Sequence, residues 1–182
     1  MKDERKGSTL SSQVAVDFSK PTAEDGHAVN RLIAECSPLD TNSVYCNLLQ
    51  CSHFPQTSIC AKNDGLLAGF TSGYLLPASP NTLFIWQVAV SSSFRGQGLA
   101  TQMLHKLLRY PNCQNVEYLE TTITDSNDAS WSLFLNLARH LSATTETSEM
   151  FENENHFKGQ HETEKSLRIG PFTKRFKPQR LL

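Results

Sequence analysis

The residues best suited to chemistry in this chain lie in a short glycine-bearing loop, made of Arg95, Gly96, Gln97, Gly98, Leu99 and Ala100. The loop follows an apolar, strand-like run at residues 83–90 and opens a segment whose apolar side chains recur at helical spacing. Glycine allows tight turns and close approach of a ligand, and a helix N-terminus attracts anions. The loop therefore predicts a cradle of backbone N–H groups for a pyrophosphate.

Carboxylates form the second group that could do chemistry, by binding an amine or accepting its proton. Glu162 and Glu164 alternate with Thr163 in a strand-like segment, so their side chains share one face. A solvated strand edge would show the same pattern. Asp40 precedes a helical segment, where an aspartate commonly serves as the helix cap. Taken alone, these three residues leave both interpretations open.

Two other classes of phosphate-binding loop fit the sequence less well. A Walker loop requires Gly-Lys-Ser or Gly-Lys-Thr, and neither follows Gly98. A dinucleotide fingerprint would find its acidic residue about twenty positions on, at Glu117 or Glu120. It fails at Thr101, because the third small position holds a β-branched residue.

The elements that must position these residues mix helical and strand patterns along the chain. Residues 63–65, Asn-Asp-Gly, are a strong hairpin signal, and Asp40, Thr41 or Asn42 could cap the second helix. A polar stretch at residues 142–160 predicts a mobile loop with a short strand near Met150 and Phe151. We expect helices at residues 22–36, after Pro38, after Gly98 and from Asn127 to residue 141, and strands at residues 58–62, 66–76, 83–90, 116–124 and 162–169.

Length and composition predict one compact domain. The chain has 182 residues, of which 38% are hydrophobic and 19% charged, and its net charge is −1. That charge gives no general attraction to nucleic acid, and no segment predicts a membrane span or a signal peptide. We expect a flexible polar tail at residues 1–18, the domain at 19–173, and a basic tail at 174–182.

The five cysteines do not predict a disulfide framework, because their number is odd and no Cys-x-x-Cys pair occurs. Cys46, Cys51, His53 and Cys60 fit no familiar spacing of zinc ligands. Free, partly buried thiols in the reducing cytoplasm are the preferred interpretation, and no metal is expected.

The loop pattern Arg-x-x-Gly-x-Ala, with a strand before it and a helix, strand and helix after it, resembles the GCN5-related N-acetyltransferases (GNAT). The resemblance implies an α/β (α+β) fold whose mixed, mostly antiparallel sheet has six or seven strands, a central splayed parallel pair and flanking helices. It also implies acetyl-coenzyme A (acetyl-CoA) as co-substrate. The residues that would bind it are the loop 95–100 together with Val88, Ala89, Val90, Asn127 and Ser130.

Four further motifs resemble a narrower family, the L-2,4-diaminobutyrate acetyltransferases of ectoine biosynthesis. They are residues 39–45, 84–90 and 124–130 and the terminal run 161–164 before residues 168–169. This resemblance covers residues 21–172 and implies acetyl transfer to the 4-amino group of L-2,4-diaminobutyrate. It places Asp40, Thr41, Asn42, Trp86, Glu162 and Glu164 in the substrate pocket.

Such a reaction must remove a proton from the substrate ammonium, which at pH 7 costs about 4.6 kcal/mol for a lysine-like pKa near 10.4. Glu164 could take the proton through a water, and His161 could relay it or merely end the loop. The Val88 amide could polarise the thioester oxygen. Many relatives carry a tyrosine as the acid for the leaving thiolate where this chain has Phe134, which leaves Tyr45 as the candidate.

Three other expectations stay open. The chain could acetylate another small diamine or amino acid or a peptide N-terminus, or it could bind coenzyme A as a non-catalytic sensor. The resemblance also suggests a homodimer, for which the strand at residues 162–169 could supply an edge contact.

Overall fold

The computed structural model describes residues 15–172, which form a seven-stranded sheet of order β1-β2-β3-β4-β5-β7-β6. Neighbouring strands run antiparallel except β4 and β5, which are parallel. This confirms the expected mixed sheet with one parallel pair. The strands are β1 (Asp17–Ser19), β2 (Ile59–Asn63), β3 (Leu66–Leu76), β4 (Ser79–Val90), β5 (Tyr118–Thr124), β6 (Thr145–Phe151) and β7 (Glu164–Ile169).

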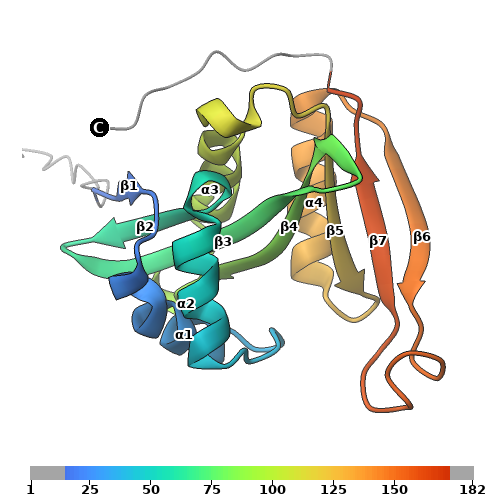
Figure 1. The fold of residues 1–182 in the computed structure, drawn as a ribbon, viewed down its shortest axis with the longest axis horizontal. Helices are drawn as coiled ribbons and strands as arrows, with labels where there is room; N and C mark the ends of the chain where they lie inside the picture. The colour runs from blue at the N-terminus through green and yellow to red at the C-terminus, as the bar shows by residue number, and fades with distance from the viewer. Residues whose placement is uncertain (1–14, 173–182) are drawn as a thin grey trace, which may run out of the picture.

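Four α-helices cover the two faces of the sheet (Figure 1): α1 (Gly26–Ala34), α2 (Val44–His53), α3 (Leu99–Leu107) and α4 (Asp128–Leu141). One core, centred on Leu83, Ile85 and Leu119, packs against α3 and α4; the other, centred on Phe70 and Ala89, packs against α1. Between residues 15 and 172, no helix combines the length and apolar character that crossing a bilayer requires. The first of these cores holds α3 and α4 on the same side of β4.

Several boundaries differ from the sequence-based expectations. Asp17 and Phe18, expected to belong to the N-terminal tail, pair with β2, so the sheet begins earlier than expected. Residues 1–14 of that tail and residues 174–182 lie outside the described residues. Helix α2 is capped by Ser43, whose side chain accepts from the Cys46 amide, and not by Asp40, Thr41 or Asn42. The hairpin is confirmed, with positive φ at Asp64 and Gly65.

The region after α4 shows the largest departure from expectation. Instead of a mobile loop with a short strand, residues 145–151 form the full edge strand β6, paired along its length with β7. Strand β7 lies between β5 and β6, so the expectation that residues 162–169 form an edge is wrong. The exposed and mostly polar side chains of β6 hid this strand, because an edge strand needs only one partner and no buried face.

Strands β4 and β5 separate at the centre of the sheet and create the gap on which the site depends (Figure 1). They pair only where Thr82, Leu83 and Phe84 meet residues 118–120. Beyond this point the register of β4 against β3 shifts between Ile85 and Gln87, leaving Trp86 as a bulge. The bulge changes the alternation, so that Val88 and Val90 now contact the same core as Leu83 and Ile85.

Candidate active site

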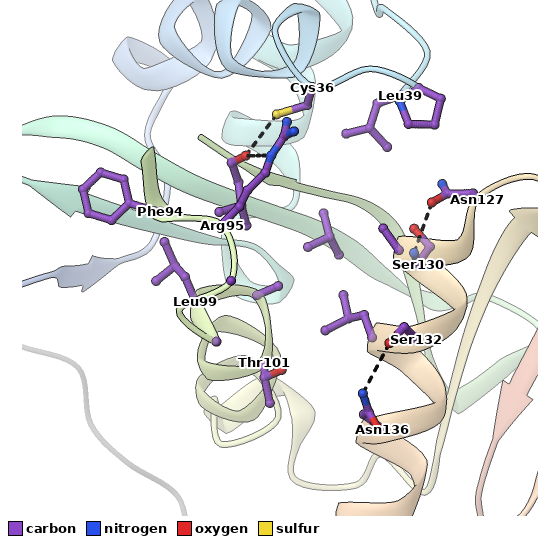
Figure 2. A pocket seen from close by; sticks show the side chains of 18 of the residues that line it. Cys36, Leu39, Phe94, Arg95, Leu99, Thr101, Asn127, Ser130, Ser132 and Asn136 are labelled. Atoms are coloured by element: carbon purple, nitrogen blue, oxygen red, sulfur yellow. Dashed lines mark hydrogen bonds between the residues drawn. The ribbon is translucent and has the colours of Figure 1, made fainter. Parts of the chain in front are cut away.

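A cavity of about 530 Å³ lies between the carboxyl end of β4, the loop before α3 and the first turns of α4 (Figure 2). Of the predicted coenzyme-binding residues, Ala89 and Gln97 alone do not line it: Ala89 is buried in the core, and the Gln97 side chain donates to the Ser93 carbonyl. The lining residues that were predicted are Val88, Val90, Arg95, Gly96, Gly98, Leu99, Ala100, Asn127 and Ser130.

The loop has the backbone conformation that an anion cradle requires. Gly96 and Gly98 have φ values of 73° and 75°, in the left-handed region where glycine is favoured. Gly98 is also the N-cap of α3, so the free amides of the first helical turn begin directly after it. An anion in this cavity would meet these amides and the positive end of the helix dipole.

The backbone of Val88 and Val90 faces the gap between β4 and β5. Ser91 N donates to the Ala68 carbonyl of the strand before β4, at 2.9 Å. Because hydrogen-bonding residues alternate along an antiparallel strand, the polar groups of Val88 and Val90 point away from β3. The Val90 carbonyl already accepts from Arg95 Nε at 3.1 Å and from the Cys36 thiol at 3.3 Å (Figure 2). The Arg95 side chain therefore anchors the loop to β4.

The start of α4 forms the opposite wall. Asn127 is the N-cap, as predicted, and its Oδ1 accepts from the Ser130 amide at 3.1 Å. Trp131 Nε1 donates to the Thr124 carbonyl and so ties this end of the helix to β5. Asn127 and Ser130 thereby keep a fixed position where two cavities meet.

A second cavity of about 220 Å³ adjoins the first and shares Pro38, Leu39, Val88, Asn127 and Ser130 with it. Its walls come from the α1–α2 loop, the bulge of β4, β5 and the segment before β7. The other lining residues are Asp40, Asn42, Ile85, Trp86, Gln87, Thr121, Thr122, Thr124, Phe134, His161 and Glu164. The two adjoining cavities can hold two ligands whose reacting ends meet at the shared residues.

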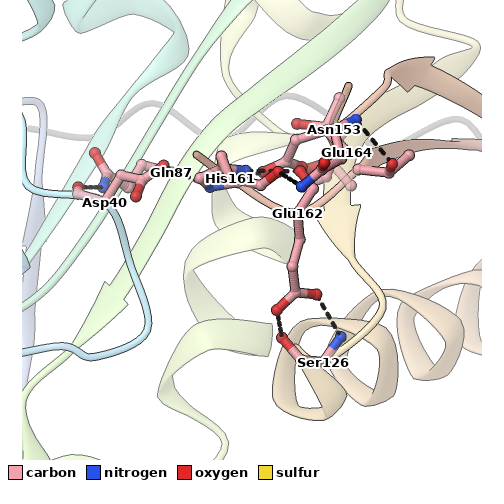
Figure 3. Close-up of polar contacts among 10 residues, drawn as sticks. Asp40, Gln87, Ser126, Asn153, His161, Glu162 and Glu164 are labelled. Carbon is pink, nitrogen blue, oxygen red and sulfur yellow. Dashed lines mark hydrogen bonds and ion pairs between the residues drawn. The ribbon is translucent and has the colours of Figure 1, made fainter. Parts of the chain in front are cut away.

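His161 is the centre of a charged cluster in this second cavity (Figure 3). Its Nε2 lies 3.1 Å from Asp40 Oδ2 and 3.9 Å from Glu164 Oε1, while its Nδ1 donates to the Glu162 carbonyl at 2.7 Å. The pKa of His161 is raised by that carbonyl and further by the carboxylates of Asp40 and Glu164. The position between these two carboxylates suits a cation such as a substrate ammonium.

Glu164 is the most enclosed carboxylate of the cluster. Its side chain is 18% exposed, and its Oε2 is buried without a hydrogen-bond partner among the described residues. Burial raises the pKa of Glu164, opposed by a hydrogen bond from Thr122 and by the charge of His161. A buried oxygen that lacks a donor is ready to accept one from a ligand.

Besides Ala89 and Gln97, three predicted catalytic or substrate-binding residues are not brought into either cavity. Glu162 turns toward the loop before α4, where its Oε1 accepts from Ser126 Oγ at 2.8 Å (Figure 3). Tyr45 lies on the surface of α2 with 68% exposure, and Thr41 is exposed beside it. Alternation on a strand predicted that Glu162 and Glu164 share a face, but β7 begins only at Glu164, so Glu162 follows the preceding loop.

Sequence reasoning missed Gln87 and the threonines of β5. A glutamine inside the apolar run at 83–90 was a visible signal, because a buried polar side chain requires a partner. Thr122 and Thr124 alternate on β5, which marks one polar face. Neither signal alone indicates which side of the sheet carries the site.

The cysteines form no metal centre within residues 15–172, where no group of three or more metal-ligating side chains occurs. All five are free thiols. Burial raises the pKa of Cys51 to about 11 and that of Cys113 to about 12, so both thiols are protonated at neutral pH.

Both the sequence and the fold are similar to those of known proteins. The acetyltransferase (GNAT) family profile matches residues 27–138. An L-2,4-diaminobutyric acid acetyltransferase of Methylotuvimicrobium alcaliphilum is 52% identical over 86% of this chain and 91% of its own length. The corresponding Vibrio cholerae protein is 50% identical over 84% of this chain and 88% of its own length.

A solved structure indicates the same family as the sequence relatives. Diaminobutyrate acetyltransferase EctA from Paenibacillus lautus, in complex with L-2,4-diaminobutyric acid and coenzyme A, superposes with a TM-score of 0.85 and 39% identity. The match covers 89% of this chain and 98% of that one. The chain therefore belongs to the GNAT family of acetyltransferases, and within it to the L-2,4-diaminobutyric acid acetyltransferases.

The charged cluster leads to a first prediction. In the ligand-free protein the pKa of His161 is expected to lie above 6.5, and Asp40→Asn is expected to lower that pKa because one of the carboxylates that stabilise the imidazolium is removed. Titration of the His161 ring by NMR measures this. Asp125→Asn removes a carboxylate that pairs with Lys165 instead, and should leave the His161 pKa unchanged. A His161 pKa that Asp40→Asn does not lower would contradict the ion pair between Asp40 and His161.

Proposed function

We propose that this protein transfers the acetyl group of acetyl-CoA to the 4-amino group of L-2,4-diaminobutyrate, giving 4-acetamido-2-aminobutanoate for ectoine biosynthesis. The observation that carries this proposal is the pair of adjoining cavities, one an anion cradle and the other acidic, in a chain 52% identical to a named diaminobutyrate acetyltransferase.

The cofactor cleft fits acetyl-CoA. The left-handed glycines and the amides at the start of α3 suit a pyrophosphate, and the outward backbone of Val88 and Val90 suits the amide groups of a pantetheine arm. Bound there, acetyl-CoA supplies an activated thioester. The Val88 amide, at the junction of the two cavities, is the donor for the oxygen of that thioester.

The acidic cavity selects and deprotonates the diamine. Asp40 and Glu164 attract its ammonium groups, and Trp86 forms one wall. The 2-amino group lies beside the substrate carboxylate and is the less basic of the two amines. Selection of the 4-amino group therefore depends on positioning rather than on nucleophilicity. Glu164, whose raised pKa favours proton uptake, accepts the proton directly or through a water, and His161 holds Glu164 and Asp40 in place.

The leaving thiolate needs a proton, and the geometry changes the candidate for its source. Phe134 lines the second cavity where many relatives have a tyrosine, and Tyr45 lines neither cavity. The hydroxyl-bearing residue common to both cavities is Ser130. We therefore assign Ser130 and Asn127 to the sulfur end of the coenzyme, in place of Tyr45.

A product analysis tests the proposal. The protein is offered diaminobutyrate, ornithine, lysine and a short peptide with acetyl-CoA, and thiol release is followed by mass spectrometry of the products. Acetylation of diaminobutyrate at nitrogen 4, with much slower reaction of the others, is the expected result. Equal turnover of the peptide would favour a peptide N-terminal acetyltransferase, and coenzyme binding without turnover would favour a sensor.

We propose further that the protein is a cytoplasmic homodimer. The free thiols suit a reducing compartment. The edge strand β6 is exposed at all seven residues, including Met150 at 43% and Phe151 at 39%, and supports pairing with a second copy. Light scattering should give twice the chain mass of 20.3 kDa, and Met150→Lys should weaken the dimer; a monomer at high concentration would refute it.

A further inference from the structure

The loop between α1 and α2 carries Asp40 into the substrate cavity, yet its second half, residues 40–43, contributes no side chain to either core. Residues 40–43 form no helix or strand, and the Asp40 side chain is 75% exposed. A carboxylate that must meet a small diamine within a few tenths of an ångström needs a support behind it. That support consists of side-chain amides.

On the helix side, the support begins at Asn30 of α1. Asn30 Nδ2 donates to the Asn42 carbonyl at 2.7 Å and to Asn47 Oδ1 at 2.9 Å. Asn47 Nδ2 in turn donates to Gln50 Oε1 at 2.9 Å. Asn47 and Gln50 are buried, at 0% and 1% exposure, so the hydrogen bond between them is shielded from water. The loop is thereby tied to both helices.

On the sheet side, the support ends at Gln87 of β4. Asn42 Nδ2 donates to Gln87 Oε1 at 2.8 Å, and Gln87 Nε2 approaches the Asp40 carbonyl at 3.4 Å (Figure 3). Gln87 follows the Trp86 bulge and is 7% exposed. The loop therefore lies between the helix pair and the strand that lines the substrate cavity.

The chemistry of the side-chain amide group gives this series of hydrogen bonds a direction. Asn47 and Gln87 each accept with the side-chain oxygen and donate with the side-chain nitrogen, which neither a carboxylate nor an apolar side chain can do. Asn42 accepts with its backbone carbonyl and donates with its side-chain nitrogen. Buried polar groups that lose a partner are strongly disfavoured, so the paired amides of Asn47 and Gln87 favour one arrangement.

We propose that the carboxamide chain of Asn30, Asn42, Asn47, Gln50 and Gln87 positions the Asp40 carboxylate for the diamino acid. Asn30 and Asn47 are then positioning residues for substrate binding, although neither lines either cavity. The inference rests on the proposed function and adds to it the residues that determine how the acidic pocket is held.

The first test is Asn30→Ala, which removes both donors from a half-buried helical position where alanine is well tolerated. The KM for diaminobutyrate is expected to rise about fivefold, while the affinity for coenzyme A changes by less than about twofold. Thr57→Val is the matched control, because it removes a buried hydrogen bond to the Gly73 carbonyl that does not belong to the carboxamide chain. It should lower the melting temperature without changing the KM for diaminobutyrate.

A double-mutant cycle separates positioning from a general structural role. If Asn30 acts through Asp40, its substitution should raise the KM by less than about twofold in an Asp40→Asn background. The same fivefold rise in both backgrounds, or an equal loss of coenzyme A affinity, would overturn the inference. Should Asn30→Ala fold poorly, Asn30→Ser serves the same cycle.

The NMR pKa of His161 provides a readout that does not require turnover. Displacement of Asp40 in Asn30→Ala should lower the His161 pKa, whereas Thr57→Val should leave it unchanged. If the unmodified protein does not acetylate diaminobutyrate, the proposed function fails while this readout still decides the positioning role. A His161 pKa unaffected by Asn30→Ala would refute that role.

Discussion

Glu164→Gln is expected to lower kcat/KM for diaminobutyrate by a factor of about 10²–10³, the range typical for loss of a proton-accepting group. The carboxylate is 18% exposed and lines the substrate cavity, and its Oε2 has no hydrogen-bond partner among the described residues. Glutamine keeps the shape but cannot accept a proton from the amine. Initial rates over a range of pH measure the effect.

The rate of the reaction should decrease at acidic pH. Burial raises the pKa of Glu164 above 4.5, so the carboxylate becomes protonated, and the rate falls, as pH decreases through that raised value. In Glu164→Gln this acid limb should disappear. The raised pKa also means that ionised Glu164 destabilises the fold: the free energy of unfolding decreases as pH rises from 4.5 through the folded-state pKa. At pH 7 the variant should therefore melt no lower than the unmodified protein.

The control for this prediction is Glu162→Gln. The Glu162 side chain accepts from Ser126 outside the cavity, so its replacement should change kcat/KM much less. Equal losses in both variants would show that net charge, and not the enclosed position of Glu164, determines the activity. A Glu164→Gln variant that keeps most of its activity would refute the role of Glu164.

Gly98→Val is expected to weaken coenzyme A binding about 10–30-fold. Gly98 has a φ of 75° directly before α3, a conformation that costs an L-residue about 1–2 kcal/mol and a β-branched residue more. No atom lies within 4 Å of a Cβ at this position, so the effect comes from the backbone conformation and not from a clash. If the loop relaxes, its amides turn away from the anion. Calorimetry with coenzyme A measures the loss.

Gly65→Val is the matched control for that substitution. Gly65 has a φ of 77° and equally open surroundings, but it lies in the β2–β3 hairpin and lines neither cavity. Its replacement should strain the backbone similarly while leaving the affinity for coenzyme A unchanged. If both variants lose the same affinity, strain acts through overall stability and the anion cradle at residues 95–100 is not supported.

The coenzyme half of the site was predictable because it is local. The glycines, the helix N-terminus and the cap at Asn127 all follow from residues within a few positions of one another, so their spacing carries the information. Ala89 and Gln97 are the exceptions, since one faces the core and the other bonds its own loop. The hairpin at Asp64 and Gly65 was predictable for the same local reason.

The substrate half was only partly predictable because it is assembled from distant segments. Asp40, Glu164 and His161 do meet, but Glu162 and Tyr45 do not join them. Local alternation could not reveal that β7 begins at Glu164, nor that exposed β6 pairs with it. Gln87 escaped notice because its partners, Asn42 and the Asp40 carbonyl, lie more than forty residues away in the chain.

By itself, the sequence determined the order of the elements from α1 to α4, the glycine loop before α3 and the family to which the motifs belong, since each depends on short-range spacing. Tertiary structure alone decided which carboxylates line the second cavity and which side chains bond to the Asp40 loop. The physical reason is that a bulge at Trp86 and the separation of β4 from β5 set the direction of backbone and side chains across the gap, and these depend on contacts between strands.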